Sequence, residues 1–395
     1  MNTPKIRFKG FEDDWEQRKF GELVNEIREK TKSENEDTLL SCAIDGMYLN
    51  SELFSHFRGS SNIGYLKVKK NDLILSAQNL HLGNCNVNLR FEHGIISPAY
   101  KVYELVDCNP LFIQAWVKQD STKDFFLKAS TEGASVCRKN IVWEELYEQT
   151  VSVPEIKEQE KIGYYFRSLD HLITLHQRKC DETKQLKKFM LQKMFPKNGE
   201  KNPEIRFEGF TDDWEQRKVS DITNSYSGGT PKSGTSEYYD GNIPFIRSGE
   251  IYSDKTELFI SELGMNYSSA KRVHIGDILY ALYGATSGEV SRAKLDGAIN
   301  QAILAIIPNQ DINADFLVEW FRKEKDKIIN TYLQGGQGNL SAQIIKELVV
   351  MIPSKEEQYK LGNYFTYINR LITLHQRKCE KLKELKKFML QNMFV

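Results

Sequence analysis

The chain has 395 residues, of which 40% are hydrophobic and 27% charged, and its basic and acidic side chains balance to a net charge of zero. This length allows two or three domains with separate cores, and the composition is ordinary for a globular protein. The absence of a long apolar run and of a signal-peptide pattern excludes a membrane-spanning helix and predicts a cytoplasmic location.

A repeated frame organises the chain. The phrase PKIRFKGFEDDWEQRK at 4–19 returns as PEIRFEGFTDDWEQRK at 203–218, with 13 of 16 positions identical. The phrase beginning LITLHQRKC at 172–195 returns at 371–394, with 19 of 24 positions identical and the same offset of 199 residues. The chain therefore consists of two tandem units, and a fixed internal period of this kind decides the architecture.

The stretches inside the frames, 20–153 and 219–352, share almost no sequence, although NDLIL at 71–75 echoes GDILY at 276–280. The duplication could be a relic, but divergent inserts in matching frames favour one scaffold with two related tasks. β-branched and aromatic runs separated by glycine turns predict short strands, with a helix in each insert. The expected elements are strands Ile243–Arg247, Ile278–Tyr283 and Ala302–Ile307, and helices Pro110–Lys118 and Ala314–Tyr332.

Residues 155–195 and 354–394 predict two long helices, because each follows a proline and carries apolar residues at three- and four-residue spacing. A rod of this length spans roughly 60 Å. We expect the two apolar stripes to pack on each other as an antiparallel, pseudo-twofold coiled coil; the alternative is that each helix packs only on its own insert. The predicted fold class is α+β, with segments 1–153 (first domain), 154–199 (central helix), 200–352 (second domain) and 353–395 (distal helix).

Catalytic motifs are missing from the sequence. We find no P-loop, no H-E-x-x-H, no G-x-S-x-G and no Pro-Pro pair of an amino-methyltransferase loop. The six cysteines include no C-x-x-C pair, so reduced thiols are expected rather than zinc ligands. The acidic pairs Asp13–Asp14 and Asp212–Asp213 are interpreted as turn or helix-capping residues, not as metal ligands. We therefore expect no catalytic and no metal site.

The insert loops instead carry side chains that suit base edges and phosphates, although polar loops can also be ordinary solvated surface. Arginine pairs with guanine, asparagine and glutamine pair with adenine, and lysine holds phosphates. The candidate DNA-binding residues are Gln78, Asn79, His81, Arg90, Arg138, Lys139, Thr230, Lys232, Arg247, Ser248, Tyr283, Thr286, Arg292, Gln337 and Asn339. A wider group with the same chemistry comprises Asn84, Asn86, Asn88, Asn140, Asn300 and Gln301.

The duplicated frame, the proline before Glu158–Gln159 and Glu357–Gln358, and the phrases SGGTPKSG, GNIPFIRSGEI and GDIL resemble the specificity subunit of type I restriction–modification enzymes. The resemblance implies that each insert is a target-recognition domain reading half of a split, asymmetric DNA sequence. It implies that the helices space the domains and that the chain docks two methyltransferase subunits, which are joined by restriction subunits. The first insert departs from the pattern, since it has no GGTP phrase.

The resemblance further implies a subunit without cofactors of its own: S-adenosylmethionine, ATP and Mg²⁺ would belong to the partner subunits. Two alternatives are the recognition half of a split DNA-modifying enzyme and a coiled-coil scaffold that binds only proteins. The near identity of Lys187–Lys188 with Lys386–Lys387 suggests scaffold and partner contacts, or else sequence-blind phosphate contacts. Trp15 and Trp214 are expected to anchor each frame phrase in its domain.

Overall fold

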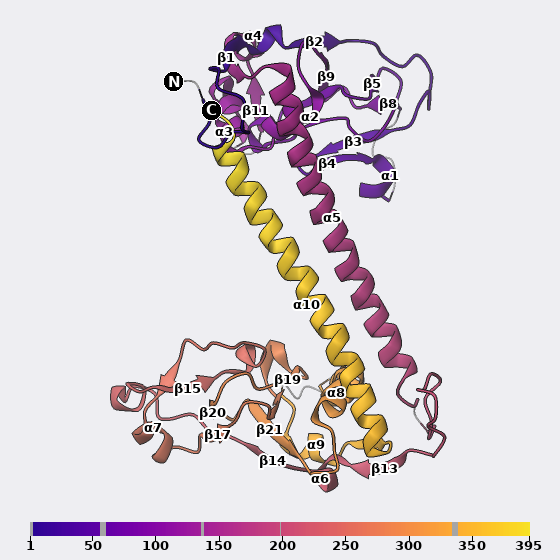
Figure 1. Ribbon diagram of the computed structural model, residues 1–395, viewed down its shortest axis with the longest axis vertical. Helices are drawn as coiled ribbons and strands as arrows, with labels where there is room; N and C mark the ends of the chain where they lie inside the picture. The colour runs from indigo at the N-terminus through magenta and orange to yellow at the C-terminus, as the bar shows by residue number, and fades with distance from the viewer. Residues whose placement is uncertain (1–2, 56–60, 136–137, 198, 334–338) are drawn as a thin grey trace. The chain divides into compact units, whose positions relative to one another are not determined.

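The computed structural model describes residues 3–55, 61–135, 138–197, 199–333 and 339–395 (Figure 1). It divides into two compact units, residues 1–177 with 376–395 and residues 178–375. Each unit thus contains one insert, the first part of the helix that follows that insert, and the end of the other long helix. Within the described ranges, no helix is both long and apolar enough to cross a membrane.

The first unit is built on a four-stranded antiparallel sheet in the order β2-β9-β6-β7, with four two-stranded ladders around it. Its strands are β1 (Glu16–Lys19), β2 (Val24–Ile27), β3 (Leu40–Ala43), β4 (Gly46–Leu49), β5 (Leu66–Lys69), β6 (Leu73–Ser76), β7 (Cys85–Val87), β8 (His93–Ile96), β9 (Tyr100–Leu105), β10 (Ser130–Ser135), β11 (Arg138–Ile141) and β12 (Thr150–Val153). Its helices are α1 (Asn50–Leu53), α2 (Pro110–Trp116), α3 (Asp120–Lys128), α4 (Trp143–Glu148) and α5 (Ile156–Lys193), the last continuing into the second unit.

The second unit repeats this plan, with a sheet in the order β14-β21-β18-β19 and a second four-stranded sheet, β16-β15-β20-β17. Its strands are β13 (Glu215–Lys218), β14 (Thr223–Ser227), β15 (Ile243–Ile246), β16 (Phe259–Ile260), β17 (Lys271–Val273), β18 (Ile278–Ala281), β19 (Val290–Arg292), β20 (Gly297–Ile299), β21 (Ile303–Pro308) and β22 (Val349–Ile352). Its helices are α6 (Val219–Ile222), α7 (Glu262–Asn266), α8 (Ala314–Tyr332), α9 (Ala342–Glu347) and α10 (Lys355–Asn392), whose end belongs to the first unit.

The two sheets reveal a likeness that the insert sequences hardly show. The echoing phrases at 71–75 and 276–280 lie on β6 and β18, which hold the same place in their sheets. The frame phrases also pair alike, because Glu16 lies opposite Val153 and Glu215 lies opposite Ile352. The α+β prediction is confirmed, and the predicted strands and helices of the second insert form within a few residues of the expected bounds.

The long helices pack on each other and on the inserts. In the first unit, Lys386 of α10 contacts Asp170 of α5, and the Cys379 thiol reaches the Ile173 carbonyl oxygen at 3.9 Å. Residue numbers rise along one helix as they fall along the other, so the helices are antiparallel here. The predicted helix packing is confirmed, but the first half of each helix also lies in the core of its own insert, through Ile162 in the first unit and Leu361 in the second.

One aromatic cluster in each unit joins insert, frame phrase and helix end. In the first unit the Phe394 ring lies 5.4 Å from Phe112, 5.9 Å from Phe166 and 6.1 Å from Trp15. In the second unit Phe195 takes the place of Phe394, at 5.4 Å from Phe316, 6.0 Å from Phe365 and 6.1 Å from Trp214. Both tryptophans are buried, which confirms the anchoring role predicted for them.

Backbone hydrogen bonds fix these helix ends against the frame phrases. Ile6 donates its backbone N–H to Asn392 at 2.8 Å, and Ile205 donates to Lys193 at 2.9 Å. Helix ends leave carbonyl groups without helical partners, so these bonds also satisfy exposed acceptors. The same contact therefore stabilises both units. It joins segments that are distant in sequence in the first unit and neighbouring segments in the second.

Replacing Phe394 with alanine should destabilise the first unit by about 3–5 kcal/mol, because it removes a buried ring from a packed aromatic cluster. The midpoint of thermal unfolding, followed by near-ultraviolet circular dichroism, measures the loss. Val395→Ala is the matched control, since Val395 is the next residue and is exposed. Equal melting of the two variants would contradict the role assigned to Phe394.

Candidate nucleic-acid interface

In the first unit, polar loops gather at one edge of the main sheet. β2 and β6 end at this edge, whereas β9 and β7 begin there. Ala77 donates its N–H to Ala99 at 3.0 Å, and Lys139 donates its N–H to Gln78 at 3.2 Å. The structure thus brings the segment with Gln78, Asn79 and His81 next to the β10–β11 hairpin, which carries Arg138 and Lys139.

The corresponding edge in the second unit gathers loops from four places in the sequence. Leu282 donates its N–H to Ala302 at 2.8 Å, Tyr283 forms a bridge with Asn339, and the Thr230 hydroxyl donates to the Gln301 side chain at 2.8 Å. Gly228 packs closely against this edge, and only glycine fits there, because a Cβ would lie 1.8 Å from the Ile299 carbonyl oxygen. We call this set of loops, together with those of the first unit, the loop edges.

Four further candidates lie along the second loop edge. Arg247 directly follows Ile246, the parallel partner of Ile299, so it leaves the sheet at the same end as Asn300. Ser248 comes next, and the Thr286 hydroxyl donates to the Tyr283 carbonyl at 3.4 Å. Lys232 is exposed in the loop that also carries Thr230.

Arg247 is held by carboxylates in this structure. Its guanidinium lies 2.7 Å from a Glu250 oxygen and 3.1 Å from a Glu257 oxygen. The hydrogen bonds from Arg247 lower the pKa of Glu250 to about 2, despite an opposing effect of burial. A base or phosphate that binds Arg247 must therefore compete with charged partners within the chain.

Two predicted residues lie elsewhere. Arg292 pairs with Ile278 at the start of β18, which is the opposite end of the sheet from the loop edge, and its guanidinium contacts Asp315 at 2.8 Å. Arg90 follows β7, likewise away from the loop edge, and forms a bidentate pair with Glu52 at 2.6 and 2.8 Å. The structure does not bring either residue to the other candidates. Gln337 falls outside the described residues.

Asn86 and Asn88, from the wider group, are buried rather than displayed. The Asn88 amide donates to the carbonyls of Lys69 at 3.0 Å and Phe91 at 2.8 Å, and its oxygen accepts from the Phe91 N–H at 3.1 Å. Asn86 donates to the Ala43 carbonyl at 2.6 Å. Both side chains satisfy backbone groups, so the interpretation of them as base readers is wrong.

Sequence reasoning missed a buried ion pair in each frame. Arg7 contacts Glu158 through two hydrogen bonds of 2.8 Å, and Arg206 contacts Glu357 in the same way. The signal was available, because each arginine lies in a repeated phrase and each glutamate recurs at the same offset of 199 residues. Both pairs therefore have the same separation of 151 residues. These pairs tie each frame phrase to the first turn of its long helix.

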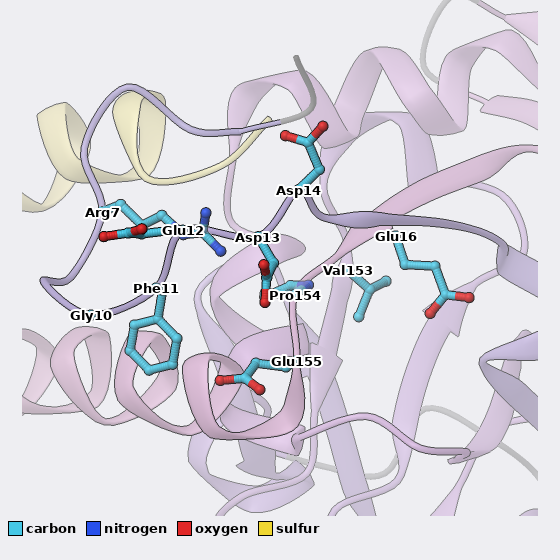
Figure 2. A pocket seen from close by; sticks show the side chains of 10 residues that line it. All are labelled: Arg7, Gly10, Phe11, Glu12, Asp13, Asp14, Glu16, Val153, Pro154 and Glu155. Atoms are coloured by element: carbon cyan, nitrogen blue, oxygen red, sulfur yellow. The ribbon is translucent and has the colours of Figure 1, made fainter.

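An acidic pocket of about 270 Å³ lies beside the first ion pair (Figure 2). Its lining includes Arg7 and the carboxylates of Glu12, Asp13, Asp14 and Glu155. The described residues contain no group of three or more side chains able to hold a metal ion. Asp13 and Asp14 precede strand β1 rather than a helix, which supports the turn interpretation and not the capping one.

The lysines at the helix ends do not behave alike. Lys187 contacts buried Glu319 at 2.8 Å, and Lys386 contacts Asp170 at 2.5 Å. Burial lowers the pKa of Lys187, although the Glu319 carboxylate opposes this shift. Both side chains therefore make scaffold contacts inside their units, and for them a partner or phosphate contact stays a prediction. Lys188 and Lys387 are exposed, and for them the prediction stands.

Comparison with known proteins finds specificity subunits of type I restriction enzymes. Residues 211–384 match the family described as the type I restriction modification DNA specificity domain. The MjaIX specificity subunit of Methanocaldococcus jannaschii is 29% identical over 46% of this chain and 44% of its own length. The HindI specificity subunit of Haemophilus influenzae is 28% identical over 37% of this chain and 33% of its own length. These two alignments span less than half of either relative, whereas the MjaVIII specificity subunit of M. jannaschii is 22% identical over 95% of this chain and 91% of its own.

Two solved structures share the fold. The S subunit of a type I restriction-modification system from M. genitalium has a TM-score of 0.67 at 14% identity and covers 100% of this chain and 99% of that chain. A chain from a study of complex assembly and conformational transition in the type I R-M system has a TM-score of 0.53 at 16% identity, covering 96% and 97%.

Replacing Asn88 with alanine should destabilise the protein by about 1–3 kcal/mol, because three backbone groups lose their hydrogen-bond partner in a buried site. Urea unfolding measures the effect. Asn140→Ala is the control, since Asn140 is exposed. If the two variants unfold at the same urea concentration, Asn88 is not a structural residue.

Proposed function

Because the chain belongs to the family of type I restriction–modification specificity subunits, which are non-catalytic, we propose that it selects the DNA target of a cytoplasmic type I complex. Each domain reads one half of a bipartite, asymmetric DNA sequence through its loop edge. The chain docks two methyltransferase subunits, and restriction subunits join through them. S-adenosylmethionine, ATP and Mg²⁺ bind to these partner subunits and not to this chain.

The observation that carries the proposal is the pair of equivalent loop edges. The sheets β2-β9-β6-β7 and β14-β21-β18-β19 have the same strand order, and each collects polar loops at the same edge. Yet the residues at those edges differ, with Gln78 and Lys139 in the first unit and Tyr283, Gln301 and Asn339 in the second. Two equivalent surfaces with different hydrogen-bonding groups support two different half-sites.

The long helices support the spacing part of the proposal. α5 and α10 each have 38 residues, so each spans about 57 Å. That length exceeds one turn of B-DNA, about 34 Å, which is the minimum separation for two readers on the same face of a duplex. The helix pair thus sets the number of unread base pairs between the half-sites.

Exchanging residues 219–352 for the corresponding insert of a related subunit should change one half of the methylated motif and leave the other half intact. The reciprocal exchange of 20–153 is the matched control and should change only the other half. Single-molecule sequencing of methylated bases in cells that express each chimera with the methyltransferase gives both motifs. The modular proposal fails if both halves change together, or if neither changes.

The docking proposal rests on an apolar face that occurs twice. Leu186 and Phe189 are 49% exposed each, and their repeats Leu385 and Phe388 are 40% and 52% exposed. Residues three apart lie on the same side of a helix, so each pair forms one face. Identical exposed faces on two helices suit two copies of one partner, because each copy then meets the same side chains.

The Phe189→Ala and Leu186→Ala double variant should copurify with one methyltransferase subunit instead of two, and so should Leu385→Ala with Phe388→Ala. Combining all four substitutions should abolish copurification. Native mass spectrometry of the purified complex counts the subunits. Tyr367→Ala is the control, because Tyr367 is 62% exposed on α10 but its repeat is Ser168. Two subunits retained by the fourfold variant would place the docking surface elsewhere.

A further inference from the structure

The second unit contains a buried carboxylate where α8 meets the ends of the long helices. Glu319 of α8 lies 2.8 Å from the Lys187 ammonium and accepts a hydrogen bond of 2.8 Å from the Asn369 amide. Arg322 also pairs with Glu319. Burial opposes the ionisation of Glu319, but Arg322 and Lys187 outweigh it and hold the pKa of Glu319 below its usual value.

The first unit has the same helices but a different arrangement of charge. Asn109 and Asn313 precede α2 and α8 as equivalent capping residues. The Asn109 backbone N–H donates to the Gln159 side chain at 2.8 Å, and the Asn313 N–H donates to the Gln358 side chain at the same distance. Counting from these residues, Phe112 matches Phe316 and Trp116 matches Trp320. Ala115 therefore occupies the position of Glu319.

The carboxylate that the first insert lacks is supplied by the frame. Lys386, the repeat of Lys187, contacts Asp170 at 2.5 Å, and Asp170 is the repeat of Asn369. A cavity of about 200 Å³ lies beside Ala115, and Asp170, Lys386 and Lys118 also line it. Each unit thus has one carboxylate for its repeated lysine, placed on α5 of the frame in the first unit and on the insert in the second.

We propose that this exchanged carboxylate is a positional lock, which determines in which of the two frames an insert can be stably seated. The inference deepens the proposed function, because seating decides which half-site each target-recognition domain would read. An insert with glutamate at this position fits a frame with asparagine, as in the second unit. An insert with alanine there fits a frame with aspartate, as in the first unit.

Mismatched combinations leave charge unbalanced at a place that is largely buried in the second unit and partly exposed in the first. An insert with glutamate in the first frame would put a second carboxylate beside Asp170, in a cavity whose cations are Lys386, Lys118 and Arg167. Like charges at such distances disfavour ionisation of both carboxylates. An insert with alanine in the second frame would leave the Lys187 ammonium beside the Asn369 amide without any carboxylate. Removing one partner of a buried ion pair is strongly destabilising.

A double-substitution cycle in the full chain tests the lock in the second unit without any DNA. Glu319→Ala should lower the midpoint of thermal unfolding by roughly 5 °C or more. Asn369→Asp alone should lower the midpoint too, because it places a second carboxylate beside Glu319. The two substitutions together should recover most of the loss, since they recreate the arrangement of the first unit. Glu319→Gln, which preserves side-chain volume, serves in the cycle if Glu319→Ala aggregates.

The corresponding substitutions in the first unit test the same proposal. Ala115→Glu alone should lower the midpoint, whereas Ala115→Glu with Asp170→Asn should be restored, because the cavity beside Ala115 has room for the side chain. If the effects of the single substitutions simply add in both units, the lock is refuted. This readout is independent of DNA reading, so the lock can fail while the domain-exchange experiment succeeds, and the reverse.

A chimera tests the consequence for function. When 219–352 is placed in both frames, the chain with Asp170→Asn should give a higher melting midpoint than the chain that retains Asp170. Its methylated motif should then contain the half-site of the second insert twice. Equal stability of the two chimeras would overturn the proposal, even if both methylate the duplicated motif.

Discussion

The seating of a phenylalanine from each long-helix end in an aromatic cluster is the interaction on which both units depend. A helix of 38 residues has an apolar stripe longer than one insert can cover. Its first half packs in the core of its own insert, and the second residue after its C-terminal end supplies the ring that completes a cluster around Trp15 or Trp214. A domain that changed its fold at this cluster would lose its contact with the end of the other long helix. This constraint explains why the frame residues match while the inserts differ.

This arrangement separates the part of each unit that confers stability from the part that displays chemistry. The aromatic clusters and the buried pairs Arg7–Glu158 and Arg206–Glu357 lie where the frame phrase and helix meet the insert. The loop edges are formed by connections between strands, and their candidate side chains are exposed or half-buried wherever the structure describes them. Substitutions at the loop edges therefore alter hydrogen-bonding groups with little effect on the core, as is typical of loops held on a rigid scaffold.

Much of the architecture could be predicted from the sequence, because repeated phrases and apolar spacing are local signals. The helices, the anchoring tryptophans and the echo between β6 and β18 belong to this class. Strand pairing is not local, and so Arg247 and Arg292 looked equivalent although only Arg247 follows a strand toward the loop edge. The partners of Lys187 and Lys386 could not be predicted for a related reason. The sequence around the two lysines repeats, but their partners Glu319 and Asp170 occupy positions at which the two units differ.

The split composition of the first unit has a consequence for biosynthesis. The second unit is one continuous stretch, residues 178–375, so all of its core is available once that stretch leaves the ribosome. The first unit needs Met393 and Phe394, which are added 227 and 228 residues after Phe166. At translation rates of about 5–20 residues per second, the first insert waits roughly 10 to 45 seconds for its last aromatic ring. The nascent chain therefore completes the core of its second unit before that of its first, and until then the Trp15 cluster lacks the Phe394 ring.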